Sequence, residues 1–75
     1  MNFEKALTAL KQGQKIIRQG WSGYEEYVIL VNQPEQVDGI DVLPYFAIRV
    51  KGEGYAMFQP TMCDILAEDW ELVHD

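Results

Sequence analysis

The stretch "IIRQGWSGYEEYVILVN", residues 16–32, predicts two strands of a hairpin and the turn between them. Residues 14–19 contain β-branched side chains and end at Gly20, which favours a first strand. Residues 26–32 hold an unbroken apolar run, so we expect the second strand to be buried on both faces. Between them, "WSGYEE" indicates a turn, because Ser-Gly is a turn dipeptide and glycine adopts positive φ without steric cost.

Upstream of this hairpin, the segment "NFEKALTALKQG", residues 2–13, predicts an amphipathic helix. Its apolar side chains recur at the spacing i, i+3, i+4 and i+7, which places them on one helical face. These side chains are Phe3, Ala6, Leu7 and Leu10. Asn2 is a favourable N-cap residue, and Gly13 is a favourable residue to end the helix.

Downstream, residues 33–44 carry two prolines, one glycine and three acids, which predicts a loop or a pair of loose turns. Residues 45–50 and 54–58 predict short strands, and the intervening "KGEG" suits a tight hairpin. Thr61 and Asp64 stand at the spacing of a capping box, which predicts a short helix over "PTMCDILA". The final apolar segment, "DWELV", predicts a last strand.

This order of elements predicts an α+β fold, a small antiparallel sheet with an N-terminal helix and a short second helix near the C-terminus. We expect a single domain, residues 1–75, which buries only about 60% of the surface that the unfolded chain exposes. So small a core leaves a marginal stability, and assembly with copies of itself would stabilise the fold.

The charge of the chain argues against binding to DNA or RNA. The net charge is −6, whereas binding to a nucleic acid polymer depends on accumulated Lys and Arg. Residues 1–18 nevertheless hold four of the 6 basic residues and one of the 12 acids, so an anionic ligand is expected to bind to this part of the chain.

The charged N-terminus and the short apolar runs predict a cytoplasmic protein that does not enter a membrane. A single cysteine agrees with a reducing compartment.

Residues suited to catalysis are few. The chain has one cysteine, Cys63, and one histidine, His74, so we expect neither a metal site nor a nucleophile beside a base. No phosphate-binding loop or dinucleotide fingerprint occurs, so we expect no cofactor. The carboxylates of "AEDWE", residues 67–71, leave two interpretations open, namely a solvated acidic turn or a pair of catalytic groups.

Aromatic rings beside a cation give a stronger signal for ligand binding. A nucleotide base stacks on such rings with about 1 to 3 kcal/mol per base. Trp21 is a candidate for stacking or for the core, whereas we expect Trp70 in the core. Arg18 is a candidate to bind a phosphate with two parallel hydrogen bonds, or to form a salt bridge with Glu25 or Glu26.

The combination of residues at the two ends of the chain is more specific. The segment "NFEKALTALKQGQKIIRQGW", with Gly23 after it and "CDILAEDWELV" near the other end, closely resembles a family of small phage and prophage proteins. Some members of that family act as anti-Thoeris sponges. They catalyse no reaction, form homotetramers and bind the cyclic ADP-ribose-type signal made by bacterial TIR-domain proteins, and some also hold cyclic dinucleotides in separate pockets.

This resemblance implies a function and a site. The expected function is sequestration of a cyclic nucleotide second messenger in the host cytosol, by a homo-oligomer that we expect to be a tetramer. The residues that the resemblance implies for ligand binding are Asn2, Phe3, Arg18, Trp21, Thr61 and Asp64. Trp21 would be the stacking ring, and Arg18 would contact a phosphate.

Two features depart from the pattern of that family. Members commonly carry a tryptophan before the proline that precedes the last helix, where this chain has Phe58 and Gln59. The segment from Asn32 to Leu43 is compact and acidic, where relatives often insert a longer segment.

Two other functions remain open on the sequence. The chain could be a phage accessory protein that binds a host protein through its acidic surface and has no small-molecule ligand. It could also be an enzyme that degrades a nucleotide with the carboxylates of Glu68, Asp69 and Glu71. An enzyme would alter the nucleotide, whereas a sponge would release it intact.

Overall fold

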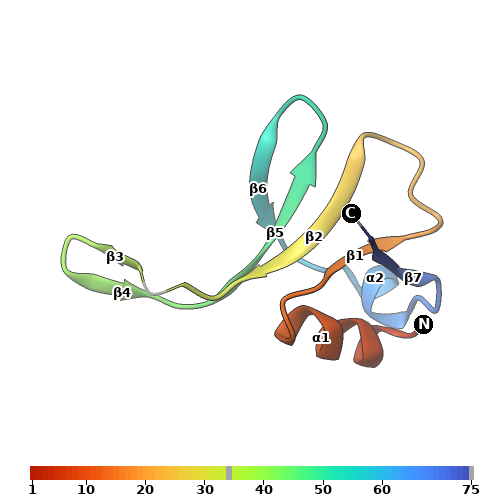
Figure 1. The fold of residues 1–75 in the computed structure, drawn as a ribbon, viewed down its shortest axis with the longest axis horizontal. Coiled ribbons are helices and arrows are strands. Elements are labelled where there is room, and N and C mark those ends of the chain that lie inside the picture. Colours follow the sequence, from red (N-terminus) through yellow and green to blue (C-terminus); the bar gives the residue numbers. More distant parts are fainter. Residues whose placement is uncertain (34, 75) are drawn as a thin grey trace.

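The computed structural model describes residues 1–33 and 35–74, and its fold is α+β (Figure 1). The elements follow one another along the chain as α1 (Phe3–Lys11), β1 (Lys15–Arg18), β2 (Glu25–Val31), β3 (Glu35–Val37), β4 (Ile40–Val42), β5 (Tyr45–Val50), β6 (Gly54–Phe58), α2 (Met62–Leu66) and β7 (Trp70–Val73). Both predicted helices and all the strands predicted from the sequence are confirmed. Within the described residues, neither helix is long and apolar enough to cross a membrane.

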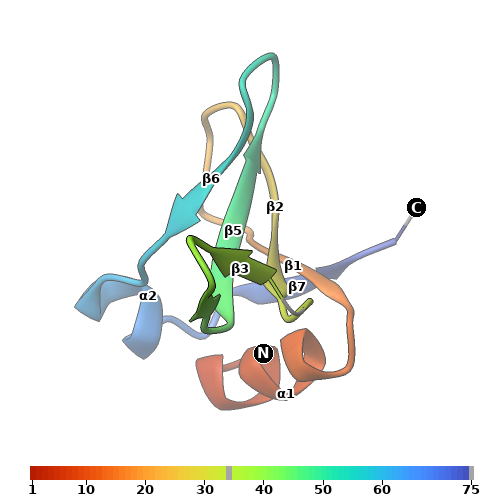
Figure 2. The same cartoon turned by 90° about the vertical axis from the view of Figure 1, so that its left-hand side faces the viewer.

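One antiparallel sheet organises the fold, with the strand order β6-β5-β2-β1-β7. Val28 of β2 lies opposite Ile16 of β1 and Ile48 of β5, so these three side chains share one face of the sheet. Helix α1 contacts β1, β2 and β7, and its buried Leu10 joins Ile16, Val28 and the buried Trp70 in the core. Figure 2 shows α1 at the base of the sheet and α2 beyond the end of β6.

The predicted helix ends are confirmed. The side-chain oxygen of Asn2 accepts a hydrogen bond from the backbone N–H of Lys5 at 3.0 Å, as an N-cap does. Gly13 follows α1 with a φ of 83°, a conformation that a side chain would strain. Helix α2 begins with the capping box of Thr61 and Asp64.

The expectation that β2 is buried on both faces is wrong within this chain. Val28 is fully buried, but Ile29 and Val31, on the opposite face of the strand, remain partly exposed. The reason is topological, because α1 packs only on the face that carries Val28.

The prediction of a loop over residues 33–44 is also wrong. Strands β3 and β4 pair as an antiparallel hairpin with Val37 opposite Ile40. Asp38 and Gly39 form the turn with φ of 53° and 78°, the two positive values that a tight two-residue hairpin turn requires. This hairpin, residues 35–43, projects away from the sheet (Figure 1), and we call it the arm.

Truncation of a buried isoleucine tests the position of the core. Ile16→Ala is expected to lower the free energy of unfolding by about 2–5 kcal/mol, because it leaves a cavity under the sheet. Ile65→Ala removes the same atoms from a side chain that is 49% exposed, and should cost less than about 1 kcal/mol. Urea unfolding followed by circular dichroism measures both values. Equal losses in the two variants would contradict this core.

Candidate ligand-binding site

Trp70, the first residue of β7, lies at the centre of the candidate site. Its side chain is fully buried, which confirms the predicted core position. Its indole N–H donates a hydrogen bond to the backbone carbonyl of Asp64 at 2.9 Å. Its backbone pairs with Arg18 in the β1–β7 ladder. One buried side chain therefore joins the last strand to α2 beside the end of β1.

Three further aromatic rings gather around this indole. The ring centroids of Phe3 and Trp70 lie 5.8 Å apart, and those of Trp21 and Trp70 lie 5.4 Å apart at an interplanar angle of 79°. The ring of Phe58 contacts Trp21, with the two ring centroids 5.8 Å apart. Trp21 is only partly buried, so its ring packs against the core and remains partly accessible, whereas its role in stacking on a ligand stays a prediction.

Arg18 forms two ion pairs at the end of β1. Its Nε donates to Oδ1 of Asp69 at 2.9 Å, and its Nη1 donates to Oδ1 of Asp64 at 3.0 Å. The alternative of a salt bridge to Glu25 or Glu26 is therefore wrong. The true partners lie 46 and 51 residues away along the chain, and no local sequence signal pairs them with Arg18.

The second oxygen of each carboxylate is also hydrogen-bonded. Oδ2 of Asp64 accepts from the backbone N–H and the hydroxyl of Thr61 at 2.9 and 3.0 Å. Oδ2 of Asp69 accepts from the backbone N–H of Gly20 at 2.8 Å. These contacts fix both carboxylates, and through them they fix the guanidinium of Arg18.

The pKa values in this network follow from its hydrogen bonds. Burial by itself would raise the pKa of Asp64, but hydrogen bonds from Thr61 and Arg18 outweigh burial and hold that pKa below its ordinary value. The hydrogen bond from Arg18 lowers the pKa of Asp69. The hydrogen bonds to Asp69 and Asp64 in turn raise the pKa of Arg18.

Gly20 leaves room for a carboxylate of this network. The chain reverses between β1 and β2 as predicted, but Gly23 does not have the positive φ expected of a glycine in this turn, and neither does Gly20. Instead, a Cβ atom on Gly20 would lie 2.8 Å from Oδ2 of Asp69, a position that the hydrogen bond keeps filled. The reversal itself is closed by the backbone N–H of Trp21, which donates to the carbonyl of Arg18 at 3.1 Å.

The residues that the sequence indicated for ligand binding lie around Trp70. Phe3 and Trp21 contact its ring, Arg18 pairs with its backbone, and Asp64 accepts its N–H. The two capping residues, Asn2 and Thr61, begin the helices that carry Phe3 and Asp64.

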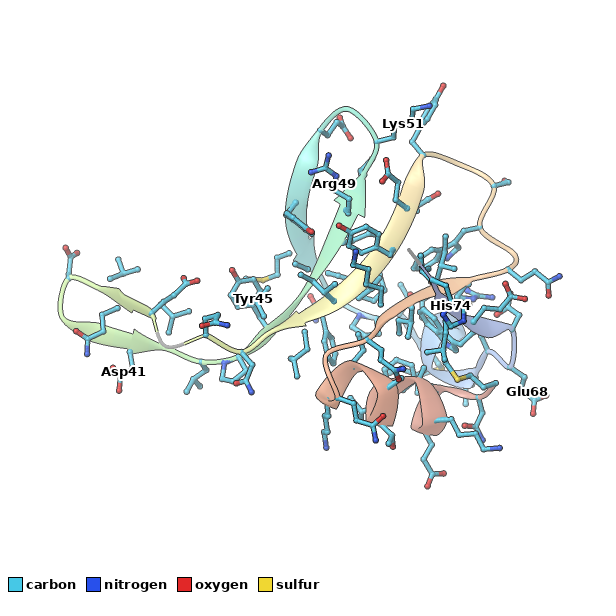
Figure 3. All side chains as sticks on the ribbon, in the orientation of Figure 1. Asp41, Tyr45, Arg49, Lys51, Glu68 and His74 are labelled. Carbon is cyan, nitrogen blue, oxygen red and sulfur yellow. The ribbon has the colours of Figure 1, made fainter. Side chains whose placement is uncertain are left out.

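The carboxylates of the acidic segment before and after Trp70 have different surroundings. Asp69 is bound to Arg18, whereas Glu68 and Glu71 are exposed, and Figure 3 shows Glu68 at the periphery. In residues 1–33 and 35–74, no group of three or more His, Cys, Asp or Glu side chains is placed to hold a metal ion.

A hollow of about 340 Å³ adjoins the aromatic cluster at Phe58. Its walls include Leu30, Tyr45, Phe46 and Gln59, and none of its lining residues is charged. Sequence reasoning did not place Tyr45 and Phe46 here, because only the pairing of β5 with β2 and β6 brings them beside Phe58. Phe58 and Gln59, where this chain departs from the expected tryptophan, thus lie at the hollow itself.

Comparison with known proteins identifies two similarities. Residues 1–73 match a family described as the Thoeris anti-defense 2-like domain. A protein of Bacillus phage SP01 named Thoeris anti-defense 2 is 29% identical over 84 residues, an alignment that covers 97% of this chain and 94% of the phage protein.

The Arg18 network predicts a loss of stability in acid. The pKa values of Asp64 and Asp69 are lower in the folded chain than the value of about 3.9 expected for the unfolded chain, so folding is favoured when both are ionised. This stabilisation is present above that unfolded value and is lost as the pH falls through the folded pKa values. Thermal unfolding between pH 6 and pH 2 measures the loss.

Two variants isolate the contribution of the network to this pH dependence. Asp69→Asn keeps the shape of the side chain but removes its charge, so the decline of the melting temperature below about pH 4 should become shallower. Asp41→Asn is the control, because Asp41 is exposed on the arm and its carboxylate bonds only to Gln36 among the described residues. A profile for Asp69→Asn as steep as that of the control would contradict the prediction.

Proposed function

Because this chain belongs to the Thoeris anti-defense 2-like family, we propose that it is an anti-Thoeris protein that binds a cyclic nucleotide signal and withholds it from the defence system. The ligand is of the cyclic ADP-ribose type, with cyclic dinucleotides as a second class, in line with the resemblance described above. The protein acts in the host cytosol as a homo-oligomer, a tetramer by the same resemblance, and leaves the ligand chemically unchanged.

The observation that carries this proposal is the partly exposed ring of Trp21, which contacts Phe58, a residue that lines an uncharged hollow. Trp21 meets Trp70 and Phe58 edge to face, a geometry that holds the ring in place. A ring fixed in advance loses little conformational entropy when a base stacks on it, which favours the tight binding that a stoichiometric sponge needs. Phe3, on the other side of Trp70, is the proposed second aromatic contact.

Charge in the site supports a pocket completed by a second copy. The hollow beside Phe58 has no cationic lining residue, yet the proposed ligand carries phosphates. Arg18 has committed Nε and Nη1 to Asp69 and Asp64, and we propose that its Nη2 is the phosphate contact. Most of the basic residues lie in residues 1–18, so a partner that presents this region would supply the missing charge.

Thr61 and Asp64 have a supporting role in this proposal. Both are hydrogen-bonded to one another, and Asp64 also holds Arg18, so they position the guanidinium at the pocket. Asn2 is proposed beside Phe3, where its side-chain amide nitrogen can donate to the ligand while its oxygen caps α1. The pairing of Asp69 with Arg18, and the exposure of Glu68 and Glu71, favour binding over catalysis.

The proposal is tested by measuring how much ligand is retained by the Trp21→Ala variant and by a control variant, Tyr24→Ala. Purified protein is incubated with cyclic ADP-ribose isomers and cyclic dinucleotides and then filtered, and compounds released by heat are identified by mass spectrometry. Trp21→Ala is expected to weaken retention about 5- to 150-fold, the loss of 1 to 3 kcal/mol of stacking, while circular dichroism still shows a folded protein. Tyr24→Ala removes an aromatic side chain that is 74% exposed and should retain the ligand as the unchanged protein does.

Other outcomes point to the other functions. Release of a cleaved or altered compound would indicate an enzyme. Passage of every compound through the filter would contradict the sponge and favour binding of a host protein through the acidic surface. Equal retention by the Trp21→Ala and Tyr24→Ala variants would leave the sponge intact but contradict the stacking role of Trp21.

A further inference from the structure

The arm exposes apolar side chains that its own chain does not cover. Val37 is 62% exposed, Ile40 is 72% exposed and Leu43 is 79% exposed. An isolated two-stranded hairpin is at best marginally stable in water, and the strands of this one have only 3 residues each. A stable conformation of the arm therefore requires another surface.

The two faces of the arm differ in polarity. Gln36 and Asp41 lie opposite one another on the first face and are joined by a hydrogen bond of 2.8 Å. Val37 and Ile40 form the next cross-strand pair, so they point to the second face. The second face is thus the one that a partner would bury.

A matching apolar surface lies on the side of the sheet opposite α1. Tyr27 and Arg49 lie on this side by register together with six further residues that we call the open sheet face, namely Ile29, Val31, Tyr45, Ala47, Tyr55 and Met57. These six residues form its apolar part. They line a shallow hollow of about 290 Å³. Tyr55 is 53% exposed and Met57 is 74% exposed, so this face, like the arm, lacks a cover.

Charge complements the apolar match. The arm contains three acids, Glu35, Asp38 and Asp41, and no basic residue. The open sheet face carries a cation, because Arg49 lies opposite Tyr55 in the ladder, with its guanidinium carbon 5.6 Å from the ring centroid of Tyr55. An acidic arm and a face that carries a cation attract each other, which favours one orientation of contact.

The arm cannot bring these two surfaces together within one chain. It leaves the sheet where β2 ends and β5 begins, and it points away from the strands (Figure 1). Figure 3 shows Tyr45 at the base of the arm, Asp41 farther out along it, and Arg49 toward the other end of β5. The acids of the arm and the cation of the sheet are therefore separated in one molecule, and they can meet only between two.

We propose that the arm of one copy packs its Val37–Ile40 face on the open sheet face of a second copy, which returns the same contact. In a two-fold arrangement, the arm of each copy covers the open sheet face of the other, so both apolar surfaces of both copies are buried. It also buries Ile29 and Val31, which accounts for the continuous apolar sequence of β2. This inference rests on the self-assembly in the proposed function but not on its ligand.

Photo-crosslinking from the arm tests the contact directly. Ile40 is replaced by p-benzoylphenylalanine, the protein is irradiated, and linked peptides are identified by mass spectrometry. We expect a covalent dimer whose linked peptide lies within residues 27–31 or 45–57. The matched control carries the same photoreactive residue in place of Thr8, which is exposed on α1, and should not link to those peptides. No covalent dimer from position 40, or links only to α1, α2 or the other arm, would overturn the proposal.

Assembly of two arm variants provides an independent measurement. Ile40→Asp places a charge on the apolar face of the arm, and light scattering over a dilution series should show at least tenfold weaker self-association. Gln36→Ser changes the polar face opposite Asp41 without altering the charge of the arm, and should assemble as the unchanged protein does. Unimpaired assembly of Ile40→Asp would contradict the proposed contact.

The two proposals fail in different ways. An unchanged protein that is monomeric by light scattering would overturn the arm contact and the homo-oligomer of the proposed function, whereas binding of a cyclic nucleotide is judged by the filtration experiment alone. An oligomer that links through another surface would overturn the arm contact and leave the ligand proposal standing.

Discussion

The hydrogen bond from the buried indole of Trp70 to the carbonyl of Asp64 is the interaction on which the rest of the structure depends. A buried N–H donor must keep its partner, so α2 cannot shift relative to the last strand without leaving that donor unpaired. The same ring supports Phe3 at the start of α1 and Trp21 after β1. A single side chain near one end of the sequence thus sets the relative positions of both helices and the central turn.

The ion pairs of Arg18 act on the same elements from the other side. Arg18 is opposite Trp70 in the ladder, and its two carboxylate partners, Asp64 and Asp69, both come shortly before that tryptophan in the sequence. Both carboxylates are also anchored by backbone N–H groups, so the guanidinium is held rather than free to move. In a fold this small, the residues proposed to bind a ligand are therefore also residues that stabilise the fold, and each functional variant needs a control for stability.

The expectations that held were those with a local physical cause. The spacing of apolar residues defined α1, Asn2 and Thr61 marked the helix starts, and the glycines of "KGEG" marked the β5–β6 turn. The arm was missed although Asp38-Gly39 between Val37 and Ile40 is a strong hairpin signal. The prolines and acids around it favoured a loop, since composition was given more weight than the one dipeptide that fixes the backbone.

The sequence by itself determined the helices, the strands of the main sheet, the caps and the membership of a family, because each depends on neighbouring residues or on the whole string of residues. Only the tertiary structure decided that Arg18 binds Asp64 and Asp69, that Trp21 is half within the core, and that β2 is covered on one face. These facts follow from the register of β1 against β7 and from the side on which α1 packs. Both are set by contacts between distant segments, which no local pattern specifies.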